Sequence, residues 1–161
     1  MTTKVLFVCT ANLCRSPMAE GVFRSLAERA GVADAFEIAS AGTSDAFVGR
    51  PPTPEAIDVA ASRGYDISAI RSRQIVTDDI VRFDYPLAMD SRHLVEMRWL
   101  APRTLVGKPQ MFLSFAPPMG IVDVSDPMGG PKAGFERALS LIEAGCKGLF
   151  ERLAPAVKAT I

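Results

Sequence analysis

The short apolar run at residues 4–8 constrains the fold more than any other feature of the sequence. It lacks the polar alternation of a strand with one exposed face. Such a run fits the middle of a parallel sheet, where both faces are buried. A helix start follows it closely, with Ser16 as the expected N-cap and Pro17 at the first helical position. The sequence therefore predicts a strand–loop–helix unit of an α/β protein.

The rest of the chain continues this alternation. Further strands are expected at residues 36–39, 84–89 and 109–115, further helices at residues 54–63, 91–97 and 132–154, and a turn or short helix at residues 78–83. Strands that alternate with helices indicate a parallel sheet between helical layers. Pro86 is unfavourable in its strand, because proline cannot donate to the ladder. The 161 residues contain no repeat or linker, so we expect a single three-layer domain over residues 1–161.

Charge and hydropathy exclude several classes of protein. The chain has 18 basic and 18 acidic residues and no net charge, so we expect no nucleic-acid or membrane partner. No stretch approaches the roughly 18 apolar residues of a membrane span. Three cysteines, Cys9, Cys14 and Cys146, are typical of reduced thiols in a cytoplasmic protein.

Two further expectations concern the predicted helix at residues 91–97 and the residues just after it. The single histidine, His93, excludes a histidine-rich metal site and is expected at the surface of the helix. Trp99 is expected to pack against the core or an edge rather than bind a ligand.

The segment from Cys9 to Arg15 lies between the first strand and its helix. Ligands of open α/β sheets bind beyond the carboxyl ends of strands, and a helix start offers free N–H groups. A tight loop there can converge several N–H groups on one anion. Arg15 can add two parallel hydrogen bonds to phosphate oxygens. The segment therefore predicts a phosphate-binding loop.

Cys9 stands at the mouth of this loop. The donors that attract phosphate would also stabilise its thiolate, which could attack phosphorus and form a phosphocysteine that water hydrolyses. The Ser16 hydroxyl can donate to the departing sulfur. The bare Cys-x5-Arg spacing also fits a structural cysteine at a strand end and a surface arginine, but the preceding strand and the following helix start favour the anion site.

A proton donor on a second loop would help the leaving oxygen depart. Asp126 is the candidate, since Pro127 fixes the neighbouring backbone and two glycines follow. An Asx turn or an N-cap before the last helix is an equally good interpretation of Asp126. Asp90, at the end of another predicted strand, is expected to be a supporting residue.

Residues 5–20 resemble the signature of the low-molecular-weight protein tyrosine phosphatases. Further similar segments follow in the order of that family at residues 40–43, 48–52, 67–68, 73–74, 83–85, 87–90, 126–127 and 135–137. The resemblance implies a four-stranded parallel sheet flanked by helices, with the phosphate-binding loop after the first strand. It implies Cys9 as nucleophile, Arg15 as the clamp of the phosphoryl group and Asp126 as general acid, with no metal or organic cofactor.

The resemblance also assigns the remaining site residues. The expected substrate-binding residues are Thr10, Ala11, Asn12, Leu13, Cys14, Ser16, Phe47 and Met128. Asn12 and Ser40 would form a hydrogen bond that holds the loop, with Asn12 in the left-handed backbone region. Cys14 matches a second cysteine that can trap Cys9 in a reversible disulfide.

Some residues depart from the family's pattern. Ala11 replaces a glycine, which costs about 1 kcal/mol if that position needs a positive φ. Met128 and Ala46 stand where aromatic walls of the substrate slot are usual, with Phe47 as a substitute beside Ala46. Ile70 replaces a histidine. Leu13 is apolar and bulky, which favours aryl phosphates. We therefore expect a phosphotyrosine protein or a small aryl phosphate as substrate, and inorganic phosphate or other oxyanions as inhibitors.

Two other functions fit the same loop. An arsenate reductase would need further cysteines at residues 75–100, where there are none. A catalytically weak phosphate-binding or regulatory module would explain the changes at Ala11, Ile70 and Met128. It would need neither the Cys9 thiol nor the Asp126 carboxyl.

Overall fold

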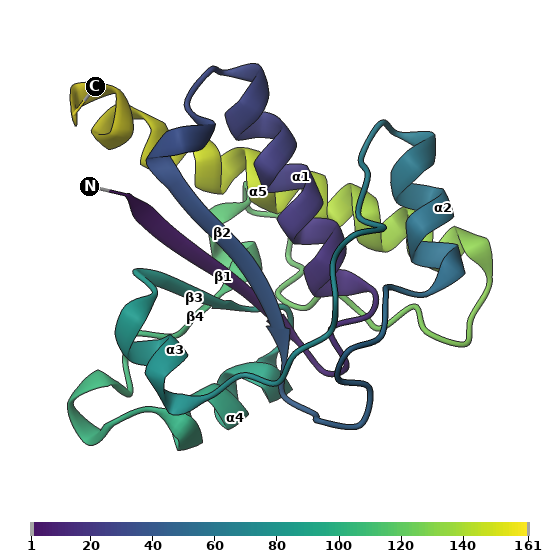
Figure 1. The fold of residues 1–161 in the computed structure, drawn as a ribbon, viewed down its shortest axis with the longest axis horizontal. Helices are drawn as coiled ribbons and strands as arrows, with labels where there is room; N and C mark the ends of the chain where they lie inside the picture. Colours follow the sequence, from purple (N-terminus) through teal and green to yellow (C-terminus); the bar gives the residue numbers. More distant parts are fainter. Residues whose placement is uncertain (1, 161) are drawn as a thin grey trace.

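A four-stranded parallel sheet forms the centre of the protein (Figure 1). The computed structural model describes residues 2–160, and the side chains of residues 2–154. The strands lie in the order β2-β1-β3-β4, and all neighbouring pairs are parallel. Their bounds are Thr3–Cys9 for β1, Phe36–Gly42 for β2, Tyr85–Ala88 for β3 and Gln110–Met111 for β4. The predicted fold class is confirmed.

Helices cover both faces of this sheet. The helices are α1 (Arg15–Arg29), α2 (Pro54–Ser62), α3 (Thr77–Arg82), α4 (Ser91–Leu100) and α5 (Lys132–Thr160), with short 3₁₀-helices η1 (Ala33–Ala35), η2 (Arg103–Leu105) and η3 (Phe112–Phe115). Figure 1 shows α1, α2 and α5 on one side of the sheet and α3 and α4 on the other. Within the described residues, no helix combines the length and the apolarity needed to cross a bilayer.

Strand β1 supplies side chains to both hydrophobic layers. Val5 and Phe7 belong to the core beneath α1 and α5, whereas Leu6 and Val8 belong to the core beneath α3 and α4. All four side chains are fully buried, as predicted for a central strand. Pro86 is accommodated because β4 pairs only with Leu87 and Ala88 of β3, so at Pro86 the strand has a neighbour on one side only.

The segment at residues 109–115 differs from the prediction. Only Gln110–Met111 is a strand, and Phe112–Phe115 forms η3. Residues three apart lie on one side of a 3₁₀-helix, so Phe112 and Phe115 both turn toward the core, where they are buried. The ring of Phe112 packs edge-on against Phe7 at 5.6 Å. In a strand, by contrast, residues three apart point to opposite faces, so Phe112 and Phe115 would not both face the core.

Two expectations for α4 are wrong. His93 is fully buried, not at the surface, and Trp99 is 86% exposed rather than packed against the core or an edge. His93 and Met97 are four residues apart and share the helix face that packs against the sheet, where Met97 is fully buried. Trp99 lies two residues beyond Met97 and therefore faces nearly the opposite direction.

Candidate active site

The loop after β1 lies at the carboxyl edge of the sheet, against the end of β2. Cys9 pairs with Gly42 in the parallel register. A side chain at Gly42 would place its Cβ 2.6 Å from the carbonyl oxygen of Thr10 and about 3 Å from backbone atoms of the next two residues. Glycine at this position therefore lets the loop pass close to β2. The amide of Ser44 donates to the same Thr10 carbonyl at 2.9 Å.

Asn12 holds the loop from within. Its φ is 57°, in the left-handed region that asparagine tolerates. The buried side-chain amide donates to Ser40 Oγ at 3.0 Å and to Ser16 Oγ at 2.8 Å. Its oxygen accepts from the backbone N–H of Arg73 at 3.1 Å. The predicted bond between Asn12 and Ser40 is present, and Ser40 in turn donates to Glu20 at 2.7 Å.

The strain considered for Ala11 does not arise. Among the described residues, Asn12 is the non-glycine residue with a positive φ, so Ala11 adopts backbone angles that any residue can take. Its carbonyl accepts a hydrogen bond from Ser72 Oγ at 2.7 Å. Alanine at this position is therefore compatible with an undistorted loop.

Cys9 and Ser16 meet inside the loop. Cys9 is buried, and its Sγ lies 3.0 Å from Ser16 Oγ. Because Asn12 already donates to this oxygen, the hydroxyl hydrogen of Ser16 is left for the Cys9 sulfur or for the Ala41 carbonyl at 3.3 Å. Ser16 is not the N-cap that the sequence suggested. Helix α1 begins at Arg15, and its N-cap, Cys14, makes no capping bond with its side chain.

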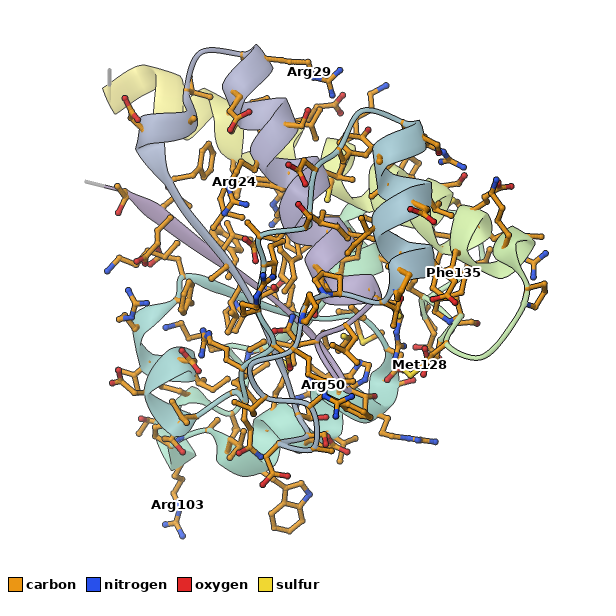
Figure 2. All side chains as sticks on the ribbon, turned by 45° about the vertical axis from the view of Figure 1, so that its right-hand side comes forward. Arg24, Arg29, Arg50, Arg103, Met128 and Phe135 are labelled. Carbon is orange, nitrogen blue, oxygen red and sulfur yellow. The ribbon has the colours of Figure 1, made fainter. Side chains whose placement is uncertain are left out.

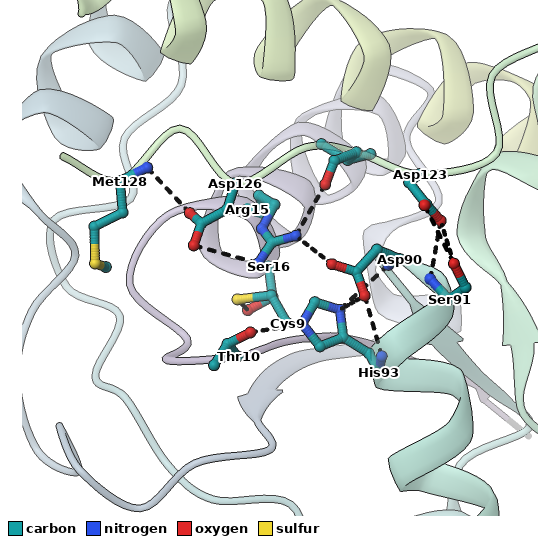
Figure 3. Close-up of polar contacts among 11 residues, drawn as sticks. Cys9, Thr10, Arg15, Ser16, Asp90, Ser91, His93, Asp123, Asp126 and Met128 are labelled. Carbon is teal, nitrogen blue, oxygen red and sulfur yellow. Dashed lines mark hydrogen bonds and ion pairs between the residues drawn. The ribbon is translucent and has the colours of Figure 1, made fainter. Parts of the chain in front are cut away.

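Arg15 reaches from α1 to two other segments (Figure 3). Its Nη1 donates to Asp90 Oδ2 and to the Val124 carbonyl, both at 2.9 Å, and its Nη2 lies 3.8 Å from Asp126 Oδ2. Burial favours a higher pKa for Asp90, but hydrogen bonds from the His93 amide and from Arg15 outweigh burial and lower that pKa. An ionised Asp90 therefore positions the guanidinium.

Asp126 forms an Asx turn, which is one of the two structural interpretations, and its position is also compatible with a role as general acid. Its Oδ1 accepts from the Met128 amide at 3.0 Å, which is an Asx turn. It does not cap α5, which begins at Lys132. The side chain is 52% exposed and borders a cavity of about 290 Å³, and Thr10, Arg15 and Asp90 line the same cavity. The structure thus brings Asp126 and the loop to one polar cavity.

The other expected substrate contacts are not all in this cavity. Leu13 and Cys14 are buried in the core cluster, and Cys14 Sγ lies 3.4 Å from Thr53 Oγ1. Burial raises the pKa of Cys14 to about 12, despite the bond to Thr53. Phe47 is half-buried beneath Arg50, and Met128 is exposed. Figure 2 shows Arg50 and Met128 on two loops rather than on helices or strands.

His93 is the site residue that the sequence analysis missed. Its Nε2 lies 2.8 Å from Thr10 Oγ1, and its Nδ1 accepts from the Asp90 amide at 3.2 Å. The four-residue spacing to Met97 was the available signal that His93 is buried. Burial, followed by the charge of Arg15, lowers the pKa of His93 to about 4. The imidazole is therefore neutral at physiological pH.

The lowered pKa of His93 predicts a loss of stability in acid. An unfolded histidine has a pKa of about 6.5, so the unfolded state binds a proton more tightly than the folded state does. This contribution to stability is complete above pH 6.5 and falls as the pH approaches 4. Between pH 7 and pH 5 the free energy of unfolding should fall in both the wild type and His93→Gln. The fall should be about 2 kcal/mol smaller in His93→Gln, which lacks the imidazole. Urea denaturation at both pH values measures the difference, and equal decreases would contradict the assignment.

Comparisons with known proteins agree with this architecture. The model of the family "Low molecular weight phosphotyrosine protein phosphatase" matches residues 4–159. A low molecular weight protein-tyrosine-phosphatase of Streptomyces coelicolor is 40% identical over 152 residues, which cover 92% of each chain. The crystal structure of YfkJ from Bacillus subtilis superposes with a TM-score of 0.91 at 31% identity, covering 97% of each chain.

Ligands are present in some of the similar solved structures. A protein tyrosine phosphatase from Entamoeba histolytica, with Hepes in its active site, has a TM-score of 0.91 at 32% identity, covering 96% of this chain and 99% of that one. Vibrio vulnificus Wzb, in complex with benzylphosphonate, has a TM-score of 0.83 at 28% identity, covering 95% and 100%. Together, the matches place this chain among the protein tyrosine phosphatases. It belongs to the low molecular weight phosphotyrosine protein phosphatase family.

Proposed function

We propose that this protein hydrolyses phosphomonoesters, with phosphotyrosine or a small aryl phosphate as substrate, through a phosphocysteine intermediate on Cys9. The observation that carries the proposal is the position of Arg15. Its guanidinium links the Cys9 loop to Asp126 at one polar cavity, with Nη2 3.8 Å from the Asp126 carboxylate. A cation, a nucleophile and an acid are the groups that transfer of a phosphoryl group from an ester requires.

In the first step, the Cys9 thiolate attacks phosphorus and the bond from phosphorus to the ester oxygen breaks. Arg15 and the loop N–H groups stabilise the charge on the phosphoryl oxygens. Asp126 donates its proton to the leaving oxygen. The products of this step are the free alcohol or phenol and a phosphorylated Cys9.

In the second step, water attacks phosphorus and the bond from phosphorus to sulfur breaks. The Asp126 carboxylate, now deprotonated, takes a proton from the water. Ser16, 3.0 Å from the Cys9 sulfur, donates to the departing thiolate. Inorganic phosphate leaves, and no metal or organic cofactor takes part in this scheme.

The preference for aryl esters rests on two side chains that the sequence assigns to the walls of the substrate slot. Phe47 and Met128 are apolar side chains on the loops after β2 and before α5, and a flexible methionine can cover an aromatic ring. The benzylphosphonate bound by the related Wzb also carries an aromatic ring beside its phosphonate. Inorganic phosphate and other oxyanions, arsenate included, would compete for the same loop.

The role of Asp126 is tested by changing the leaving group. We expect Asp126→Asn to reduce kcat/KM for phenyl phosphate, which reports the first step alone, by about 100-fold to 10,000-fold, because a general acid contributes that much. We expect a much smaller loss for p-nitrophenyl phosphate, whose leaving group departs without a proton. The kcat/KM values for both substrates give the comparison, since the second step, which also uses Asp126, does not enter them.

Asp123→Asn is the matched control for this test. Asp123 lines the same cavity, but its carboxylate accepts from Ser91 rather than facing Arg15. Its replacement should leave both rates within about threefold of the wild type. Equal losses of kcat/KM with the two substrates in Asp126→Asn would remove Asp126 from the role of general acid. A wild type that binds phosphate and hydrolyses neither ester would favour the binding module.

A further inference from the structure

A fully buried histidine stands directly behind the phosphate-binding loop. His93 lies in the first turn of α4, and its side chain is 0% exposed. It connects two residues of the polar cavity, Thr10 through Nε2 and Asp90 through Nδ1. Neither the nucleophile nor the acid of the proposed reaction requires this contact.

The ring nitrogen that carries the proton is assigned from the groups around the imidazole. His93 Nδ1 lies 3.2 Å from both the Asp90 amide nitrogen and Asp90 Oδ1. Oδ1 already accepts from the His93 amide, whereas the Asp90 amide can only donate, so we assign Nδ1 as the acceptor of the Asp90 N–H. In a neutral imidazole the proton is then on Nε2. Burial and the charge of Arg15 favour the neutral form, whereas Asp90, Glu96 and Asp126 oppose them. His93 therefore donates from Nε2 to Thr10 Oγ1 at 2.8 Å.

This bond determines what the Thr10 hydroxyl can do. Since its oxygen already accepts from His93, its own hydrogen is available to another acceptor. Thr10 follows the nucleophile Cys9 directly and lines the cavity together with Arg15 and Asp126. Phosphoryl oxygens are strong acceptors, and hydrogen bonds to an anion are stronger than neutral ones.

We infer that His93 is a positioning residue that holds the Thr10 hydroxyl as a hydrogen-bond donor to the phosphoryl group bound in this cavity. The inference rests on the proposed function for the nature of that anion. His93 itself does not touch the substrate. Figure 3 shows the arrangement, with the imidazole between Thr10 and Asp90 and with Arg15 on the other side of Asp90.

A purely structural role for His93 makes different predictions. His93 also completes a capping box with Asp90 at the start of α4, and a capping residue would affect stability without affecting phosphate affinity. His93→Asn can keep an oxygen near Nδ1 for the Asp90 amide but cannot reach Thr10. His93→Gln can place its amide N–H near Nε2 and so retain the donor to Thr10, while the Nδ1 acceptor is lost.

The test measures the affinity for inorganic phosphate by calorimetry, and kcat/KM for p-nitrophenyl phosphate, at a pH where thermal melts show all variants folded. The variants are His93→Asn, His93→Gln, Thr10→Val and the double variant Thr10→Val/His93→Asn. We expect His93→Asn and Thr10→Val each to weaken phosphate binding about tenfold. The double variant should be no weaker than Thr10→Val, since both changes remove the same hydrogen bond. His93→Gln should bind nearly as well as the wild type.

Three results would overturn the inference. They are unchanged phosphate affinity in His93→Asn, additive losses in the double variant, and an equal loss in His93→Gln and His93→Asn. The proposed function has a separate readout. Phosphate binding without turnover in the wild type would overturn the hydrolase, while the affinities of the variants still decide the role of His93. Absence of phosphate binding in the wild type would overturn both.

Discussion

Cys9→Ser is expected to reduce kcat for aryl phosphates by more than about 10⁴-fold, because removing a catalytic nucleophile leaves only binding and electrostatic effects. A serine hydroxyl stays protonated near neutral pH and is a far weaker nucleophile than a thiolate. The neighbouring hydroxyl, Ser16 Oγ, lies 3.0 Å from the sulfur and is itself a donor. Phosphate binding should persist in the variant, since the loop and Arg15 remain. Rates with p-nitrophenyl phosphate and calorimetry with phosphate measure the two effects separately.

Cys14→Ser is the matched control for the nucleophile. Cys14 lies in the same loop, but its sulfur is buried against Thr53 and its pKa is raised to about 12. It therefore remains a thiol and cannot replace Cys9. We expect Cys14→Ser to keep kcat within about tenfold of the wild type. Comparable losses in the two variants would show that the loop is sensitive to any change, and turnover by Cys9→Ser would exclude the nucleophile.

Arg15→Lys is expected to lower kcat/KM by about 1,000-fold, although the charge is conserved. The guanidinium uses Nη1 for Asp90 and the Val124 carbonyl, so that Nη2 can face the cavity. A lysine has one nitrogen and cannot make both sets of bonds in a fixed plane. Loss of one donor to a transition-state oxyanion costs about 100-fold to 1,000-fold by itself, and the misplaced charge adds to this loss.

The control for Arg15 is another arginine at the same cavity. Arg92 lines the cavity and is exposed, so Arg92→Lys should change kcat/KM less than about threefold. Thermal melts show whether Arg15→Lys remains folded, since the substitution disturbs the contact with Asp90. A folded Arg15→Lys with nearly normal kcat/KM would contradict the role of the guanidinium as the clamp of the phosphoryl group.

Local patterns in the sequence were sufficient for the parts of the fold that depend on neighbours along the chain. The unbroken apolar run at residues 4–8 predicts a strand buried on both faces, and Val5 and Leu6 do face different cores. The contact of Asn12 with Ser40 followed from the family resemblance, and the structure contains it.

Contacts between distant segments could not be predicted in this way. The bond between Thr10 and His93 exists because β1 and β3 are adjacent in the sheet, so that the residues after each strand meet. Nothing near His93 in the sequence indicates that adjacency. The same limit applies to Ser16. Serine is a residue type that suits an N-cap, but the hydroxyl of Ser16 instead contacts Cys9, Asn12 and the Ala41 carbonyl.

The central claim is that phosphate passes through a covalent bond to Cys9. The most direct test is to mix the protein with p-nitrophenyl phosphate, quench it with acid during turnover, and locate phosphate by mass spectrometry of the peptides. Asp126→Asn should increase the trapped fraction, because the second step also uses Asp126. The account predicts one phosphate on the peptide that contains Cys9, and none in Cys9→Ser. Steady turnover without phosphate on that peptide, in both the wild type and Asp126→Asn, would contradict it.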